Sequence, residues 1–377
     1  MNTLPSKGSG SKWVEHVFSG SYAGAMTPTQ PGPLRDLRLG PGRTVKVTPV
    51  FDTFWRFAYA RQDLFMRRVR GEAPPWTQDH VLAAHRFTNA YRASDRVSQY
   101  LIRHVIYDGA LEPQEVFFRT ILFKLFNRIE TWERIVRTVG EVASKTFDVD
   151  RYGTVLDAAF DADERVYSAA YIMPSPAFGE TRKHRNHLKL LQHMMADGAA
   201  HRVLRAGSLC DVFNVLRGYP SLGDFLAFQF TIDLNYSEVI NFSEMDFVVA
   251  GPGARDGIRK CFADTAGLSD ADIIQAVTER ADEEFARLGL AFQKLWGRRL
   301  QLIDCQNLFC EVDKYARVTH PEFTGSGRSR IKQKYTPNPQ PVPQWYPPKW
   351  GLKPPPAPEP MKAAGPPLQG NLPFTVR

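Results

Sequence analysis

Asp246 is the first residue whose chemistry needs an explanation, because it stands alone in the apolar run MDFVVAGPG, residues 245–253. A carboxylate that is both ionised and buried is costly unless it is paired or hydrogen-bonded. Asp246 is therefore either a structural hydrogen-bond acceptor or a group that acts on something entering a pocket. The residues alone leave both possibilities open.

A short turn precedes this acid in the sequence RGYPSLGD, residues 217–224. Gly218 can end one helix, and Asp224 suits the positive end of the next helix dipole. This is the layout of a helix–hairpin–helix element, whose turn amides can bind a DNA phosphate without reading the base sequence. The alternative is an ordinary helix corner. The residues expected to hold DNA here are Tyr219, Ser221, Leu222 and Gly223.

A third set of polar residues lies in the N-terminal half. Arg92, Arg96, Gln99 and Arg103 recur at helical spacing and would share one face of a helix. They could hold phosphates or a modified base, or they could form a buried Arg–Asp network that joins helices. The substrate-pocket candidates in this segment are Asn89, Arg92, Asp95, Arg96 and Gln99.

An acidic group near residue 310 completes the candidate pocket. Asp304 and Glu311 are seven residues apart and would share a helix face. They could bond exocyclic groups or sugar hydroxyls, or they could pair with arginines of the preceding set. Lys314 is a phosphate or substrate contact, or the partner of Asp313 or Glu311. No His or Cys cluster has ligand spacing, so we expect no metal ion and no other cofactor.

The charge of +8 is concentrated at the two ends of the 377-residue chain. Residues 321–377 carry eight Lys and Arg against two acids, and residues 1–45 carry five against two. A nearly neutral body with basic ends suits a partner with a phosphate backbone, although basic tails can also serve solubility alone. We add as DNA contacts the following residues: Gly253, Arg255, Arg328, Arg330 and Lys332.

The hydrophobic pattern predicts a mostly α protein. Apolar residues at three- and four-residue spacing run through residues 46–145, including one continuous stretch from Asp79 to Tyr107. Further helices are expected at about 183–217, 223–236, 252–263, 269–295 and 300–316. Residues 1–45 and 323–377 are rich in Pro, Gly and basic residues and are expected to be irregular arms. This leaves one helical domain, residues 46–322.

Several protein classes are excluded by composition. No apolar run reaches the roughly 20 residues that span a bilayer, and the N-terminal residues have no hydrophobic segment typical of a secretory signal. Four cysteines are too few for a disulfide scaffold. We expect a cytoplasmic protein with reduced thiols, no membrane association and no obligate protein partner.

The order of turn, helix, isolated Asp246 and a further helix is similar to that of the helix–hairpin–helix superfamily of DNA glycosylases. In that superfamily the Asp stabilises positive charge on the sugar as the glycosidic bond breaks, which a fixed anion in a dry site does well. Lyase members carry a Lys nucleophile at the position of Phe225. The resemblance therefore implies a monofunctional enzyme with Asp246 as its catalytic carboxylate.

Several separated blocks between about residues 50 and 350 resemble one clade more closely, the α-glutamyl/putrescinyl-thymine pyrophosphorylase family. The blocks are Phe54–Phe57, Phe87–Arg96, Phe123–Glu133, Gly251–Gly253 and Gln306–Tyr315. This resemblance implies a glycosylase-like helical fold and modified pyrimidines in phage DNA as substrate.

The expected function is excision of a hydroxymethylated or glucosylated pyrimidine from double-stranded phage DNA, after base flipping. One alternative is attachment of an amine to a pyrophosphorylated 5-hydroxymethyl-pyrimidine. Because the sequence has no GxxxxGK[ST] phosphate loop, another protein would have to activate the base for that reaction. A second alternative is a DNA-binding protein without catalytic activity.

Overall fold

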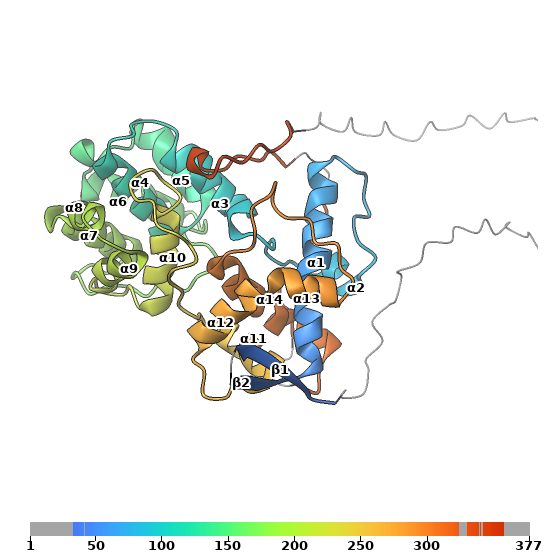
Figure 1. Cartoon of the computed structure of the whole chain (residues 1–377). Coiled ribbons are helices and arrows are strands. Elements are labelled where there is room, and N and C mark those ends of the chain that lie inside the picture. Colours follow the sequence, from blue (N-terminus) through green and yellow to red (C-terminus); the bar gives the residue numbers. More distant parts are fainter. Residues whose placement is uncertain (1–32, 41, 324–329, 339, 341, 358–377) are drawn as a thin grey trace, which may run out of the picture.

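The computed structural model describes residues 33–40, 42–323, 330–338, 340 and 342–357. Most of the described residues are helical, which confirms the predicted fold class. Helices α4 to α10 form one group, and the two ends of the chain form a second group beside it (Figure 1). We call them the middle-chain group and the end-chain group. No helix among the described residues is long and apolar enough to cross a membrane.

The end-chain group is built on α1 (Pro49–Val69), which packs against α11 (Pro252–Cys261) and α14 (Leu302–Thr319). Helix α1 begins where Thr48 accepts a hydrogen bond from the Val50 amide, with proline in the first turn. Its Phe and Trp side chains are buried, and the Phe54 ring centroid lies 4.5 Å from that of Phe309. This contact ties the first helix to the last.

Helices α11 and α14 pack so closely that glycine is required between them. A Cβ on Gly257 would lie 2.0 Å from the Phe309 carbonyl oxygen, and one on Gly253 would lie 2.3 Å from the Cys310 sulfur. The structure therefore gives Gly253 a packing role, whereas the sequence suggested a contact with DNA. The rest of this group comprises α2 (His80–Ala84), α12 (Asp270–Glu279) and α13 (Ala281–Arg287).

A small antiparallel sheet edges the end-chain group in the order β1 (Arg35–Gly40), β2 (Arg43–Val47), β3 (Phe262–Asp264). Leu37 pairs with Val45, and both side chains are buried. The prediction that residues 1–45 lack regular structure is thus wrong for residues 35–40 and 43–45. The alternating residues of this hairpin were obscured by their Gly-rich surroundings. Residues 1–32 lie outside the described residues.

The middle-chain group is centred on α4 (Pro113–Phe126), which contacts α7, α8 and α10. Its other helices are α5 (Ile129–Val139), α6 (Val149–Asp161), α7 (Lys183–Ala196), α8 (Ala199–Leu204), α9 (Leu209–Arg217) and α10 (Asp224–Leu234). A short 3₁₀ turn, Ser144–Thr146, lies between α5 and α6.

The continuous helix expected from Asp79 to Tyr107 is broken. After α2 the chain forms a loop, a 3₁₀ turn (Arg92–Ser94), α3 (Arg96–Tyr100) and a π-helical turn (Leu101–Ile106). The loop is held by polar side chains: Asp95 accepts from the Asn89 amide at 2.7 Å, and the Asn89 side chain donates to the Ser94 carbonyl at 2.7 Å. Such local bonds compete with the helix.

A C-terminal strap, which we define as residues 330–357 where they are described, follows α14 and crosses both groups. Its Gln333 and Tyr335 make backbone hydrogen bonds with Arg86 and Ala84. Near its end the strap contains a 3₁₀ turn, Pro348–Trp350, which lies near α3 and α5 (Figure 1). Part of the predicted irregular arm is therefore packed on the body, with Tyr346 buried.

Candidate functional site

Asp246 does not lie in a buried pocket. It is exposed in a turn, and the buried acid of this segment is Glu244, two residues earlier. Glu244 pairs with Arg298 at 3.2 Å. Burial raises the pKa of Glu244, and the Arg298 charge opposes that rise. The apolar run around Asp246 suggested burial, but the turn directs its carboxylate outward.

The deepest polar cluster joins Arg92, Lys124 and Asp233. The Arg92 guanidinium, 3% exposed, donates to both Asp233 carboxylate oxygens at 2.7 and 3.0 Å. The Lys124 ammonium lies 2.9 Å from the same carboxylate. Paired charges of this kind are the form in which buried ions are tolerated. We call these three residues the Arg92 network.

Neutral groups complete the Arg92 network. The Arg92 guanidinium also donates to Gln229 at 3.0 Å and to the Tyr236 hydroxyl at 3.0 Å. Lys124 donates to the Asn127 side chain at 2.8 Å. Gln229 in turn accepts from the half-buried Tyr171 hydroxyl at 3.2 Å. Every charged group of the network thus has several partners.

The pKa values in this network follow from burial and pairing. Burial lowers the pKa of Lys124 to about 8, with Asp233 opposing the shift. For Asp233, burial favours a higher pKa, but the charges of Arg92 and Lys124 outweigh it and hold the pKa below its ordinary value. The carboxylate is ionised at neutral pH, so the cluster holds one anion between two basic groups.

Asp304 links the network to α14. Its carboxylate accepts from the Arg92 backbone amide at 2.8 Å and from the Gln301 amide at 3.0 Å. Burial and the charge of nearby Glu244 together raise the pKa of Asp304 to about 7, although the two amide bonds oppose the rise. Asp304 therefore holds the 3₁₀ turn against the start of α14.

The other predicted pocket residues separate into three environments. Glu311 is buried, accepts from the Thr88 amide at 3.1 Å and pairs with Lys314 at 2.7 Å. Gln99 accepts from the Trp345 amide of the strap at 2.8 Å. Arg96 is exposed and lies 3.7 Å from Glu130. The expected shared helix face from Arg92 to Arg103 does not form, because the 3₁₀ turn and the π-helical turn interrupt it.

A second buried arginine lies under the strap. Arg61 on α1 is 9% exposed, and its Nη1 has no hydrogen-bond partner among the described residues. Burial lowers the pKa of Arg61 to about 10, and the charges of Asp95 and Glu311 oppose the shift. Burial also raises the pKa of Asp95 to about 7. The sequence analysis did not select Arg61.

The strap is fastened over the junction of the two groups by polar and aromatic contacts. The Tyr346 hydroxyl is 2.8 Å from that of Ser94. The Lys349 ammonium donates to the carbonyls of Ser237 and Ile240 at 2.6 and 2.7 Å. The Arg298 guanidinium lies 3.8 Å from the centroid of the Trp350 ring. These contacts cover the side of the junction that contains Ser94.

Two packed helices joined by a short turn are present, an arrangement common to a helix–hairpin–helix element and an ordinary helix corner. Helices α9 and α10 pack together, and the turn between them is largely exposed, with Ser221 in the left-handed region at φ 65°. Gly223 caps α10, and no side chain bonds to the first amides of that helix. Tyr219 and Leu222 are buried, so they brace the turn. The exposed residues of the turn are Gly218, Pro220 and Gly223.

The remaining predicted DNA contacts lie on the surface. Arg255 is half-exposed and donates to the Ala250 carbonyl at 3.2 Å. Arg330 and Lys332 are exposed on the strap. Arg328 lies outside the described residues. The described structure leaves these contacts as predictions.

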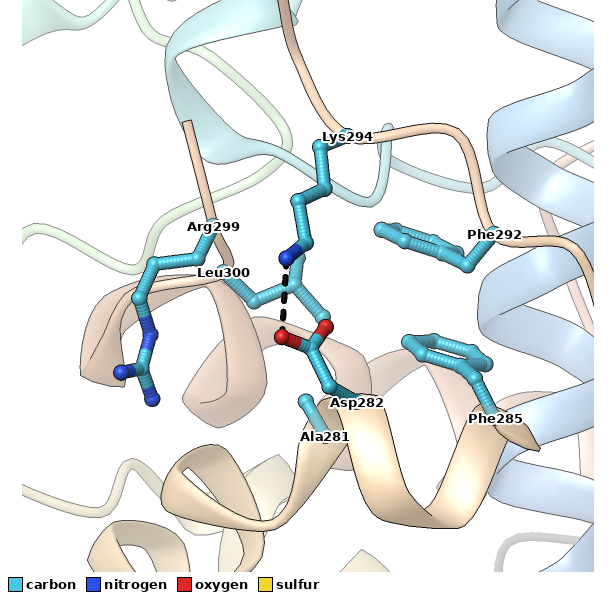
Figure 2. Close-up of a pocket in the computed structure, with 7 residues that line it drawn as sticks. All are labelled: Ala281, Asp282, Phe285, Phe292, Lys294, Arg299 and Leu300. Carbon is cyan, nitrogen blue, oxygen red and sulfur yellow. Dashed lines mark hydrogen bonds and ion pairs between the residues drawn. The ribbon is translucent and has the colours of Figure 1, made fainter. Parts of the chain in front are cut away.

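A small surface pocket lies apart from all of these residues. Figure 2 shows Phe285 and Phe292 stacked at its side, with ring centroids 4.1 Å apart, and Lys294 reaching Asp282 at 2.8 Å. It shares no lining residue with the Arg92 network. Within the described residues, no group of three or more His, Cys, Asp or Glu is placed to hold a metal ion.

Comparison with known proteins decides the family. The model of the 5-hmdU DNA kinase helical domain matches residues 48–325. The chain belongs to this family. It is also similar to the 5-hmdU DNA kinase of Bacillus phage SP10, with 27% identity over 289 residues. The alignment covers 71% of this chain and 45% of that kinase, so the chain spans less than half of its relative. No solved structure matches.

These comparisons correct the sequence analysis. The sequence blocks between residues 50 and 350 resemble the α-glutamyl/putrescinyl-thymine pyrophosphorylase family and DNA glycosylases, but the family whose model matches is a kinase family. Neither N-glycosidic hydrolysis, amine transfer nor binding without catalysis matches it. The error arose because short aromatic and polar blocks identify a helical scaffold better than they identify a reaction.

Sequence reasoning also missed Lys124, Asp233 and Gln229. Each is a polar residue inside an otherwise apolar helix, in FFRTILFKLF and DFLAFQFTIDL. A charge in such a helix has to be paired, and an acid and a base in two separate apolar helices are natural partners. That signal was available in the sequence.

Proposed function

We propose that this chain serves the phosphorylation of 5-hydroxymethyl-deoxyuridine in DNA, as the helical domain that holds the modified strand. The observation that carries the proposal is the family match over residues 48–325, supported by the name of the phage SP10 relative. A kinase of DNA needs a surface for the nucleic acid as well as a site for the phosphoryl donor.

The donor site is assigned to another part of the kinase. The sequence contains no GxxxxGK[ST] loop, and more than half of the phage SP10 kinase lies outside the alignment. In the reaction, the hydroxymethyl oxygen attacks the γ-phosphorus of a nucleoside triphosphate, and the proton of the hydroxyl passes to a general base. The bond from the γ-phosphorus to the bridging oxygen breaks, which leaves a nucleoside diphosphate and a phosphomonoester.

For the helical domain, the chemical task is therefore positioning. Phosphoryl transfer depends mainly on aligning the reacting groups and on stabilising charge. A modified nucleobase held in a fixed place therefore supplies much of what the reaction needs. The turn 218–223 and the first amides of α10, to which no side chain bonds, offer donors for one DNA phosphate. Arg255, Arg330 and Lys332 would add charge contacts that are independent of sequence.

The test is equilibrium binding of the full chain to three duplexes that differ at one position. The position carries 5-hydroxymethyl-deoxyuridine, thymidine or 5-hydroxymethyl-deoxycytidine, and affinity is measured by fluorescence anisotropy at fixed salt. We expect the tightest binding to the first duplex. Equal affinity for all three would contradict the proposal.

A second arm of the test adds labelled nucleoside triphosphate and examines the DNA by mass spectrometry. We expect the chain alone to transfer no phosphate, and transfer to appear when a kinase segment with a phosphate-binding loop is added. Phosphorylation by this chain alone would overturn the assignment of the donor site to another part.

A further inference from the structure

In the described part of the chain, five buried polar atoms on α1, on residues 85–88 and on the strap lack hydrogen-bond partners, and the charges of Arg68 and Tyr335 act on Arg61. Each is buried and has no hydrogen bond among the described residues. The atoms are Arg61 Nη1, Arg68 Nε, His85 Nδ1, Thr88 Oγ1 and Tyr335 OH. Unpaired buried polar atoms are rare in folded proteins, so a cluster of them needs a reason.

These atoms belong to three chain segments that contact one another: α1, residues 84–88 and the strap. Arg61 and Arg68 are seven residues apart on α1 and so share its face. The strap pairs with residues 84–86 through the Tyr335 amide and the Ala84 carbonyl at 3.0 Å. Arg68 also donates to the strap carbonyl of Asn338 at 3.3 Å and lies 5.1 Å from the Trp76 ring centroid. The strap thus forms one wall of this site.

The charges of the site favour an anion. Lys314 and Glu311 neutralise each other at 2.7 Å. This leaves Arg61 and Arg68 against Asp95, and neither arginine forms an ion pair with a carboxylate within the described part of the chain. Two positive groups therefore face one acid, whose own pKa is raised to about 7 by burial.

The hydrogen-bonding character of the unpartnered atoms narrows the ligand class. Guanidinium nitrogens can only donate, and the hydroxyls of Thr88 and Tyr335 can donate as well. A ligand for this set must therefore be rich in acceptors. A phosphate group meets this need, because it offers several acceptor oxygens and pairs well with arginine.

We propose that Arg61 and Arg68, together with Thr88 and Tyr335, bind the oxygens of a phosphate monoester under the strap. The site rests on the proposed function only for the source of the phosphate. The phosphate is either the phosphorylated hydroxymethyl group of the DNA product or the terminal phosphate of the nucleotide donor. Both present the same chemistry to the two arginines.

The test is calorimetric titration of the full chain with inorganic phosphate in chloride buffer of constant ionic strength. We expect saturable binding that weakens at least about tenfold in Arg61→Gln, the scale of losing charge-assisted hydrogen bonds. The matched control is Arg67→Gln on the same helix, because Arg67 is exposed and pairs with Asp63 at 2.8 Å. It should bind phosphate like the parent chain.

Two further titrations separate the sources of the phosphate. One uses a nucleoside triphosphate, and the other compares an oligonucleotide carrying a 5-phosphomethyl-deoxyuridine with its unphosphorylated form. Arg61-dependent binding in either supports the site and names its source. No saturable phosphate binding by the parent chain, or equal loss in both variants, would overturn it.

Thermal unfolding without phosphate checks that each variant is folded. Loss of selectivity for 5-hydroxymethyl-deoxyuridine duplexes with phosphate binding intact would refute the proposed function and not this site.

Discussion

Two buried arginines, Arg92 and Arg61, occupy contrasting environments in the same domain. Arg92 donates four hydrogen bonds, two of them to Asp233, and is 3% exposed. Arg61 is 9% exposed, yet its Nη1 has no partner in the described structure. Burial alone therefore does not distinguish a structural charge from a functional one; the completeness of its hydrogen bonds does.

The contrast follows from what each cluster connects. The Arg92 network joins the 3₁₀ turn to α4 and α10, and Gln229 extends it to Gln306 on α14 at 3.3 Å. It therefore holds the two helical groups together. The Arg61 site is lined on one side by the strap, whose Asn338 carbonyl accepts a hydrogen bond from Arg68. Within the described residues, Arg61 keeps an unused donor there, which a ligand can fill.

The largest effect is expected from Asp233→Ala. The change leaves Arg92 and Lys124 buried without their anion, which costs about 3–5 kcal/mol of unfolding free energy. Urea denaturation followed by circular dichroism measures it. The matched control is Asp224→Ala, whose partner Arg217 is exposed, and about 0–1 kcal/mol is expected there. A loss below about 1 kcal/mol for Asp233→Ala would break the comparison.

A smaller effect is expected in the dependence of stability on pH. The pKa of Asp304 is about 7 in the fold and 3.8 ordinarily, so the folded state binds its proton more tightly between these values. This contribution to stability is complete below about pH 4 and is lost as pH rises through 7. Asp95 acts in the same direction.

Replacing Asp304 by Asn should therefore flatten the fall in unfolding free energy between pH 5 and pH 8, without removing the part due to Asp95. Urea midpoints at several pH values measure this. Asp224→Asn on the surface is the control and should keep the slope of the parent chain. Superimposable profiles for parent and Asp304→Asn would show that the carboxyl of Asp304 does not titrate as described.

The smallest effect on stability is expected from Gly223→Asp, which should nevertheless weaken the affinity for duplex DNA. An acid at this helix cap suits the dipole of α10, so stability should change by no more than about 0.5 kcal/mol. The added charge would repel a DNA phosphate at the same amides. Ser208→Asp adds an equal charge at the cap of α9 and is the control. Equal loss of duplex affinity in both would remove the turn from the DNA surface.

Much of the fold was predictable, because helical periodicity is a strong signal. The exceptions have physical causes. The stretch from Asp79 to Tyr107 keeps helical spacing but is broken where Asn89 and Asp95 bond to nearby backbone. The helix expected over residues 269–295 ends at Arg287, and an irregular segment follows. Residues 35–40 and 43–47 form strands, and β2 also pairs with β3, a contact between segments more than 200 residues apart.

The site was less predictable, because burial of single residues depends on tertiary contacts. Glu244 directly precedes the apolar run that contains Asp246, and periodicity could not tell which of the two acids turns inward. For Asp304 the sequence left open substrate contacts or a pair with an arginine side chain, and in the structure it accepts from the Arg92 backbone amide. Glu311 pairs with Lys314, one of the two pairings that the sequence suggested. The unpartnered state of Arg61 depends on where the strap lies.

The most direct test compares Arg92→Met with Arg61→Met by urea unfolding in phosphate-free buffer. Methionine keeps an apolar side chain in each place but removes the charge. We predict that Arg92→Met loses about 3–5 kcal/mol because Asp233 loses its main partner, while Arg61→Met stays within about 1 kcal/mol of the parent. Similar large losses for both variants would contradict the distinction between a structural charge and a ligand-binding one.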